Sequence, residues 1–337
     1  YSVREKAAEF FGAWGGESVA FTSNAPEALN IAIEGLVKKG DHVITTQAEH
    51  NSVLRPLYRK EKEGAELTIL PADEKGNFSL ADMEKAVRQN TTAVICTHAS
   101  NVTGNLFPAE EIGNLCRRHG LLFILDASQS AGEAFIDMQS MHIDVLCFTG
   151  HKGLMGPQGT GGICVDPQVK IPPFKTGGSG ILSFDREHPG CMPEALEAGT
   201  LNIHGLAGLG AAFDYLRETG LEKIIEHEKR LAKLFYEEVK DIEGVRVYGD
   251  FSTGERTPAV SLNVAGYDSK EAGEILAGGY QIATRAGVHC APLIHEALGT
   301  RERGTLRFSF SWFNTEEEIY KAALAVREIG QEWKYEE

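Results

Sequence analysis

Two polar residues that directly follow apolar runs have the side-chain types needed for cofactor chemistry. Lys152 comes shortly after the apolar run 145–148, and Asp126 ends the run 120–125. Such runs predict strands buried on both faces, and ligands of open α/β sheets bind at the carboxyl ends of their strands. A lysine there can form a Schiff base with an aldehyde cofactor if burial lowers its pKa. A carboxylate there can hold the ring nitrogen of pyridoxal phosphate in its protonated form.

Each residue also has an ordinary interpretation. Lys152 could be a surface residue after a strand, and Asp126 could cap the helix that follows. The two together, each at the end of a predicted strand and in this order, favour the cofactor site.

His50 follows the predicted strand 42–46. Imidazole is flat and titrates near neutrality, so it suits both stacking on a cofactor ring and proton movement. The alternative is a structural histidine that caps the next helix.

A possible phosphate site follows the short predicted strand 19–21. Asn24, Ala25 and Pro26 begin an apolar-periodic segment with helix-start signals. The first turn of a helix presents free backbone N–H groups at its positive end, which suits a phosphate. An ordinary capped helix is the alternative.

The segments Asp126-Ala-Ser-Gln-Ser130 and Thr149-Gly-His-Lys152 resemble the class V aminotransferase family of fold-type I pyridoxal phosphate enzymes. Within it, nearly the whole chain is similar to cysteine desulfurases and selenocysteine lyases. The resemblance implies that Lys152 holds the cofactor and acts as acid and base at the substrate Cα. It also implies that Asp126 contacts the ring nitrogen and that His50 stacks on the ring. Further cofactor contacts are implied for Asn24, Ala25, Pro26, Asn101, Gln129, Thr149, His151 and Thr200.

The segment 285–290, Arg-Ala-Gly-Val-His-Cys, resembles a motif of group II cysteine desulfurases. The resemblance implies that Cys290 attacks the substrate sulfur and keeps it as a persulfide, while alanine leaves. Nearby cationic groups, such as His289 or Arg285, would favour the thiolate. The alternative for Cys290 is a small buried residue.

Substrate contacts are also implied by the resemblance. Arg307 lies in the alternating segment 304–310 and is expected to bind the α-carboxylate through a planar bidentate contact. The alternative is a cross-strand surface charge. Asn101, Arg285 and His289 complete the expected substrate-binding set.

The chain departs from the family pattern in two ways. Position 26 is usually threonine, so Pro26 removes a hydroxyl and an N–H donor from the expected phosphate site. The family also leads us to expect a preceding segment of several tens of residues, with an Asp-Asn-Ala-Ala-Thr-like strand, before Tyr1.

Strand and helix patterns alternate up to residue 165, which predicts a doubly wound α/β fold. The resemblance implies the fold-type I architecture, a large domain with a mainly parallel sheet between helices and a small α+β domain. We expect residues 1–214 to form the large cofactor-binding domain and 215–337 the small domain with the Cys290 loop. The short strand 282–284 is expected shortly before that loop.

Composition excludes several classes of function. The net charge of −15 and pI near 5.3 argue against nucleic acid and anionic membranes as partners. No apolar run approaches the roughly 18 residues of a membrane span, and the first residues are not a signal peptide. The six cysteines have neither metal-site nor disulfide-framework spacing, which fits a reducing cytoplasm.

The sequence thus predicts a homodimeric, pyridoxal phosphate-dependent cysteine desulfurase. The dimer follows from relatives in which the loop with Thr200 reaches the partner's phosphate. Relatives also pass sulfur to an acceptor protein, so we expect a partner in iron–sulfur cluster or thiocofactor assembly. Three alternatives remain open: a selenocysteine lyase, another class V aminotransferase or lyase acting on an amino acid, and a sulfur-relay or scaffold protein without catalysis.

Overall fold

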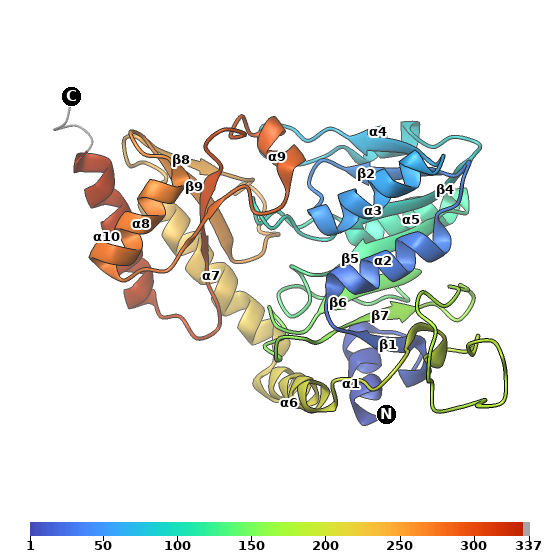
Figure 1. Cartoon of the computed structure of the whole chain (residues 1–337). Helices are drawn as coiled ribbons and strands as arrows, with labels where there is room; N and C mark the ends of the chain where they lie inside the picture. Colours follow the sequence, from blue (N-terminus) through green and yellow to red (C-terminus); the bar gives the residue numbers. More distant parts are fainter. Residues whose placement is uncertain (333–337) are drawn as a thin grey trace.

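Two sheets that pack in separate apolar cores organise residues 1–332, which the computed structural model describes (Figure 1). The larger sheet has the order β1-β7-β6-β5-β4-β2-β3. Its strands are β1 (Val19–Thr22), β2 (His42–Thr46), β3 (Glu66–Leu70), β4 (Thr91–Thr97), β5 (Leu122–Asp126), β6 (Val145–Thr149) and β7 (Gly161–Val165).

This sheet is mainly parallel, as predicted. Strands β3, β2, β4, β5 and β6 pair in parallel, and only β7 is antiparallel to its two neighbours β6 and β1. Side chains alternate across a strand, so Val94 and Cys96 of β4 enter one core while Ala93 and Ile95 enter the other. These strands consist of continuous apolar runs because both faces of the sheet are buried in a core.

Helices cover both faces of the larger sheet. On one face lie α2 (Ala25–Leu36) and α3 (Asn51–Lys62), whose apolar side chains belong to the same core. The opposite face is covered by α1 (Ser2–Phe11), α4 (Leu80–Lys85), α5 (Ala109–His119) and α6 (Ile203–Thr219). The fold-type I expectation of a mainly parallel sheet between helices is confirmed.

The smaller sheet has the order β10-β11-β9-β8, and all of its pairs are antiparallel. It comprises β8 (Val245–Tyr248), β9 (Ala259–Val264), β10 (Arg285–Gly287) and β11 (Thr305–Ser309). Its helices are α7 (Leu221–Val239), α8 (Ser269–Tyr280) and α10 (Glu316–Glu332). Phe235, Val260 and Phe308 lie at the centre of this core. The short α9 (Pro292–Ala297) instead packs through Ile294 in a separate cluster with Ala48 and Val102 of the large domain.

The predicted strand 282–284 is wrong. Gln281 ends α8 in the left-handed conformation, at φ 58°, and the strand begins only at Arg285. The strand starts where its pairing with β11 starts, and the first paired residue is Arg285, opposite Arg307. The predicted domain boundary at 214/215 falls inside α6, while Gly220, at φ 92°, separates α6 from α7.

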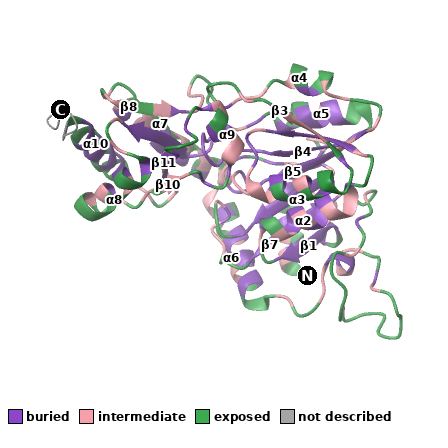
Figure 2. Ribbon diagram, turned by 45° about the horizontal axis from the view of Figure 1, so that its top comes forward, coloured by how far each residue is buried: buried purple, intermediate pink, exposed green. Residues whose placement is uncertain are grey.

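The segment 166–202 joins β7 to α6 and is long and largely exposed (Figure 2). Its regular structure is one short turn of 3₁₀ helix, η2 (Glu194–Leu196). The segment also has exposed large hydrophobic residues, namely Phe174, Leu182 and Phe184. The short η1 (Gly16–Ser18) precedes β1.

Candidate active site

A cavity of about 250 Å³ lies at the carboxyl ends of the parallel strands and the start of α2. Ten of the eleven residues predicted to contact the cofactor line it: Asn24, Ala25, Pro26, His50, Asn101, Asp126, Gln129, Thr149, His151 and Lys152. Further lining residues, which the sequence did not single out, are Ala48, Ser52, Thr97, Ala99 and Ser128. Strands distant in sequence thus bring almost the whole predicted set together.

Lys152 follows β6 and stands in this cavity. Its side chain is exposed to the open space of the cavity, but protein surrounds the amine on its other sides. This burial lowers its pKa from the usual value near 10.5, Asp126 opposes the shift, and the cations Arg307 and Arg285 add to it. The site therefore favours the neutral, nucleophilic amine more than bulk water does.

Asp126 ends β5 and is buried, with 2 % of its surface exposed. The backbone N–H of Ser128 donates to Asp126 Oδ1 over 2.9 Å, and the Ser128 hydroxyl donates to the same oxygen. The register places Asp126 opposite Thr97 of β4, another lining residue. The carboxylate is therefore held at a fixed place in the cavity wall.

His50 is both a helix cap and a cavity residue. Its Nδ1 accepts a hydrogen bond from the backbone N–H of Ser52 at the start of α3 (3.1 Å). Burial lowers its pKa, Asp126 opposes the shift, and Lys152 lowers the pKa further. The ring is therefore neutral at pH 7, and because Nδ1 is an acceptor, its proton is on Nε2.

The first turn of α2 offers few free donors to a phosphate. Asn24 caps the helix, because its Oδ1 accepts from the backbone N–H of Glu27 (3.0 Å). The Glu27 carboxylate in turn accepts from the backbone N–H of Ser23 (2.8 Å). Pro26 has no N–H, so the donors at these three positions belong to Asn24 and Ala25.

Asn101 connects the cavity to the Cys290 loop. Its Nδ2 donates to the carbonyl of His289 (2.7 Å), while its Oδ1 is buried without a hydrogen-bond partner. An unpartnered buried oxygen beside a cavity is costly, so it indicates a place for a ligand donor. Elsewhere in the cavity lining, Thr149 Oγ1 lies 3.0 Å from His151 Nδ1.

Thr200 does not line this cavity. It is exposed in segment 166–202 and borders a second cavity, of about 280 Å³, together with Phe21, Lys175 and Asn202. Thr200 therefore has no contact with the Lys152 cavity of its own chain.

Cys290 is exposed in a groove of about 400 Å³ that shares Pro26, His50 and Ser52 with the Lys152 cavity. His289 and Cys290 both have left-handed backbones, at φ 51° and 58°. Such conformations cost about 1–3 kcal/mol each in non-glycine residues and persist where surrounding contacts impose them. The Cys290 carbonyl accepts from the backbone N–H of Asn51 (2.7 Å).

The predicted cationic role of His289 is wrong. The ring is buried, with 3 % exposed, and its Nε2 contacts Thr305 over 3.0 Å. Burial and the neighbouring Arg307 lower its pKa to about 3, so it is neutral at ordinary pH. Arg285 is the exposed cation of the same segment, and its charge lowers the pKa values of Lys152 and His50.

Arg307 lies in β11 next to the cavity wall rather than in the wall itself. Its Nη1 donates to the carbonyl of Asn101 (2.8 Å), and its Nε is buried without a partner. Burial lowers its pKa to about 10, which still leaves the guanidinium charged at neutral pH. Arg307 therefore keeps one unused hydrogen-bond donor beside the cavity wall.

Glu49 is a buried carboxyl group behind the cavity that the sequence did not reveal. Its two oxygens accept from Thr46 Oγ1 (2.6 Å) and from the backbone N–H of Thr97 (2.9 Å). Complete burial raises its pKa to about 8, and the nearby Asp126 adds to the shift. A neutral Glu49 therefore ties the turn that carries His50 to β4. Only its position before His50 could have drawn notice.

Within the described part of the chain, no group of three or more His, Cys, Asp or Glu residues could hold a metal ion. Nor does any helix there have the length and apolarity to cross a membrane.

A lysine of lowered pKa, a buried carboxylate and a helix start around one cavity fit pyridoxal phosphate. The family model described as Aminotransferase class-V matches residues 1–321. A probable cysteine desulfurase of Methanothermobacter thermautotrophicus is 35% identical over 334 residues, covering 97% of this chain and 83% of that protein. Cysteine desulfurase IscS of Vibrio vulnificus is 33% identical over 341 aligned positions, covering 97% of this chain and 80% of that protein.

A solved structure gives the same relationship in three dimensions. The apo structure of a cysteine desulfurase from Thermococcus onnurineus superposes with a TM-score of 0.92 and 35% identity, covering 98% of this chain and 83% of that one. The chain therefore belongs to the class V aminotransferase family.

Proposed function

We propose that this chain is a pyridoxal phosphate-dependent cysteine desulfurase that converts L-cysteine to L-alanine and keeps the sulfur on Cys290. The observation that carries the proposal is the groove of Cys290, which shares Pro26, His50 and Ser52 with the Lys152 cavity. Class V reactions without sulfur transfer need no thiol at this place. The names of the relatives support the same function.

Pyridoxal phosphate, when bound, supplies an electron-withdrawing ring that acidifies the substrate Cα. Lys152 would hold its aldehyde carbon, and Asp126 would face its ring nitrogen. His50 presents a neutral flat ring to the same cavity, and the unpartnered Oδ1 of Asn101 adds an acceptor. The phosphate would lie at the start of α2, near Ala25 and His151.

Lys152 would move the proton at the substrate Cα. A general base works best when its pKa lies near the operating pH, and burial lowers the pKa of this amine in that direction. Arg307 would bind the α-carboxylate through its free edge, with Asn101 and Arg285 as further substrate contacts.

Cys290 would take the sulfur. Its thiolate attacks the sulfur of the substrate, the S–S bond forms, and the C–S bond breaks. The electron pair of the broken bond stays on the substrate carbon, which takes a proton, so alanine leaves and a persulfide stays on Cys290. His289 cannot help as a cation here because it is buried and neutral.

The decisive experiment measures alanine released from L-cysteine by the protein loaded with pyridoxal phosphate. The Cys290→Ala variant should lose release, while Cys191→Ala should keep it, since Cys191 is the other exposed cysteine of the described residues. Mass spectrometry should find one added sulfur on Cys290. Alanine release that survives in Cys290→Ala would contradict the proposal.

L-Selenocysteine serves as the parallel substrate. Turnover of selenocysteine without turnover of cysteine, and without any effect of Cys290→Ala, would assign a selenocysteine lyase instead. A protein that binds the cofactor but acts on neither substrate would be another class V enzyme acting on an amino acid. A protein that binds no cofactor would be a scaffold or sulfur relay.

We further propose that the enzyme is a cytoplasmic homodimer that passes its sulfur to an acceptor protein of iron–sulfur cluster or thiocofactor assembly. The exposed segment 166–202 carries Thr200 away from the cavity of its own chain, which supports a contact with the phosphate of the partner. Residues 1–214 would act as the cofactor-binding domain and 215–337 as the domain that delivers Cys290.

A further inference from the structure

Donors of the small domain form hydrogen bonds with four successive carbonyl groups in the loop between β4 and α5. Arg307 Nη1 donates to Asn101 O (2.8 Å), Ser261 Oγ to Val102 O (2.5 Å), Arg256 Nη2 to Thr103 O (3.0 Å) and Thr257 N to Gly104 O (2.8 Å). Residues 101–105 and these donors are called the interdomain clamp below. Its carbonyl acceptors belong to the large domain and its donors to the small domain.

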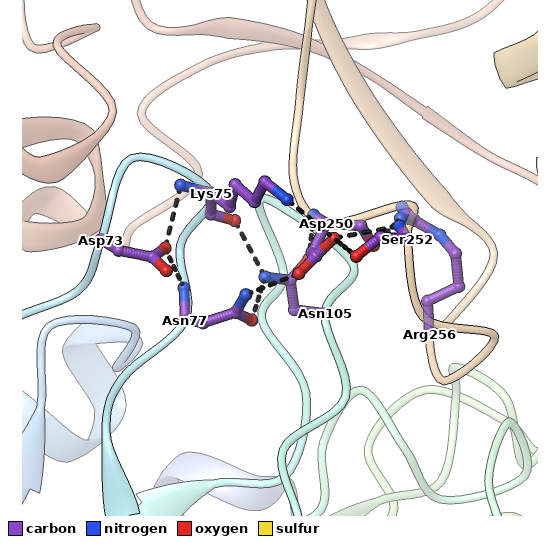
Figure 3. A network of polar contacts seen from close by, with 7 residues as sticks. All are labelled: Asp73, Lys75, Asn77, Asn105, Asp250, Ser252 and Arg256. Atoms are coloured by element: carbon purple, nitrogen blue, oxygen red, sulfur yellow. Dashed lines mark hydrogen bonds and ion pairs between the residues drawn. The ribbon is translucent and has the colours of Figure 1, made fainter.

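Asn105 completes the clamp (Figure 3). Its Nδ2 donates to Lys75 O (2.9 Å) and to Asn77 Oδ1 (2.8 Å), both in the loop after β3. Its Oδ1 accepts from the backbone N–H of Asp250 in the small domain (2.9 Å). Asn105 has 2 % of its surface exposed. Both of its amide hydrogens hold the loop after β3 within the large domain, and its oxygen reaches the small domain.

Asp250 of the small domain contacts the loop after β3 in the large domain (Figure 3). Its carboxylate accepts from Asn77 Nδ2 (2.9 Å) and lies 3.6 Å from Lys75 Nζ. Its carbonyl accepts from Arg256 Nη1 (3.1 Å), so the clamp and this loop share Arg256. Arg256 is itself buried, with its guanidinium over the Phe251 ring.

The backbones in the clamp approach each other too closely for a side chain. Gly104 has φ +74°, and a Cβ there would lie 2.4 Å from Ala259 O. Gly249 has φ +109°, and a Cβ there would lie 2.6 Å from Thr103 O. The domains are therefore fitted together at this loop by contacts that tolerate little displacement.

The clamp leads directly to the nucleophile. Asn101, at its first position, lines the Lys152 cavity and also donates to the carbonyl of His289, the neighbour of Cys290. Arg307, one of its donors, is the register partner of Arg285 at the start of the strand that leads to Cys290. One loop thus connects the cofactor cavity with the sheet that carries the thiol.

We propose that the interdomain clamp positions the Cys290 thiol against the Lys152 cavity, with Asn105 as its main positioning residue. The inference rests on the proposed desulfurase function. Proton movement at the substrate Cα uses Lys152 and the large domain, whereas sulfur transfer needs the thiol within about 3–3.5 Å of the substrate sulfur. A loosened clamp would slow the second process and spare the first.

The test compares these two processes in Asn105→Ala, with Ser261→Ala as a milder variant that removes a single clamp hydroxyl. Loss of the α-proton of L-alanine in D₂O reports proton movement, and alanine release from L-cysteine reports sulfur transfer. In Asn105→Ala, release should fall about 10- to 100-fold, while α-proton exchange changes less than about twofold. Ser261→Ala should shift the same ratio in the same direction by a smaller factor.

Ile112→Val, which removes one methylene from the large-domain core away from the clamp, is the control for a general loss of stability and should leave the ratio unchanged. Hydrogen–deuterium exchange at the Asn51 amide gives a second readout, because that N–H donates to the Cys290 carbonyl. Its protection should fall in Asn105→Ala. Equal losses of both rates, or unchanged protection at Asn51, would overturn the proposal.

The Asn51 readout does not depend on the reaction. If the wild-type protein releases no alanine, the proposed function fails, while loss of protection in Asn105→Ala still supports the positional role of the clamp.

Discussion

The backbone N–H of Asn51 donates to the carbonyl of Cys290 over 2.7 Å. Asn51 is the first residue of α3, directly after the cap His50, whereas Cys290 belongs to the small domain. Together with the bond from Asn101 to His289, this contact holds the thiol loop against the cavity from two sides. Contacts from the large domain thus set the position of the nucleophile, although Cys290 itself belongs to the small domain.

The two roles of His50 can be separated by a pair of variants. His50→Asn keeps a good helix cap but removes the ring, so stability should stay close to wild type while cofactor affinity and activity fall. His50→Phe keeps an aromatic ring but loses the cap, which should cost about 1 kcal/mol of unfolding free energy. Denaturant unfolding and titration with pyridoxal phosphate measure the two effects, and identical behaviour of the variants would contradict the separation.

Lys152 should capture the cofactor at lower pH than an ordinary lysine amine. Burial and the charges of Arg307 and Arg285 lower its pKa, so the neutral amine exists further below pH 10.5. Removal of one of these cations in Arg285→Gln should shift the midpoint of cofactor capture to higher pH. Absorbance of the lysine-bound cofactor, recorded against pH, checks this.

Lys152→Ala is the control for that titration and should bind pyridoxal phosphate without a linkage that borohydride can trap. A shift of the Arg285→Gln midpoint to lower pH would contradict the electrostatic explanation.

Glu49 should make the protein less stable as the pH rises. Its pKa is about 8 in the folded protein and 4.5 without burial, so the folded state binds more protons between these values. Stability from this group is complete below about pH 4.5 and is lost as the pH rises toward 8 and beyond. Glu49→Gln keeps the shape without ionising. Its oxygen can accept from Thr97 N, and its amide N–H can donate to Thr46 Oγ1 in place of the bond that Thr46 donates now. It should therefore match wild type at pH 5 and be more stable at pH 8.5.

Thermal unfolding at several pH values checks the Glu49 prediction. Some slope should remain in Glu49→Gln, because burial also raises the pKa of Glu133 to about 8 and of Glu228 to about 7. Parallel curves for wild type and Glu49→Gln would show that Glu49 does not titrate in this range.

Pro26→Thr should tighten cofactor binding. The change adds a backbone N–H and a hydroxyl at the cavity, and one extra hydrogen bond is worth about 0.5–1.5 kcal/mol. The dissociation constant should therefore fall by about 2- to 12-fold. Affinity should stay unchanged for pyridoxal without phosphate, which distinguishes a phosphate contact from a change in the cavity shape.

The buried ion pair of Arg4 and Glu197 should be costly to break from one side. Arg4 donates from both terminal nitrogens to Glu197 (2.6 and 2.7 Å), and Glu197 also accepts from Phe21 N (2.7 Å). Glu197→Ala leaves a buried guanidinium and should cost about 3–5 kcal/mol of unfolding free energy. The double variant Arg4→Met/Glu197→Met should recover much of this loss in denaturant unfolding. A double variant as unstable as Glu197→Ala would contradict this.

The sequence predicted the residues at the ends of the parallel strands because strand ends follow from local apolar runs. Asp126, Lys152 and His50 each follow such a run, and the fold brings them into one cavity. The strand before Cys290 was misplaced, since its start depends on pairing with β11 and on no local pattern.

Burial was harder to predict than position. His289 stands in a motif that suggested a cation, yet Thr305 and the surrounding protein keep it neutral. The roles of Glu49 and Asn105 could not be predicted, because Thr97 and Asp250, which they contact, are distant in sequence and become neighbours only after folding.

The antiparallel pairing of β1 with β7 has a consequence for folding during synthesis. β1 (Val19–Thr22) leaves the ribosome long before β7 (Gly161–Val165), which is its only neighbour in the described sheet. Since β1 leads directly into the turn at Asn24 and Ala25, this corner of the cavity cannot be completed until β7 has emerged. A nascent chain that stops before Gly161 would contain all the parallel strands β2 to β6. It would still lack the strand that pairs with β1 and so fixes the proposed phosphate site.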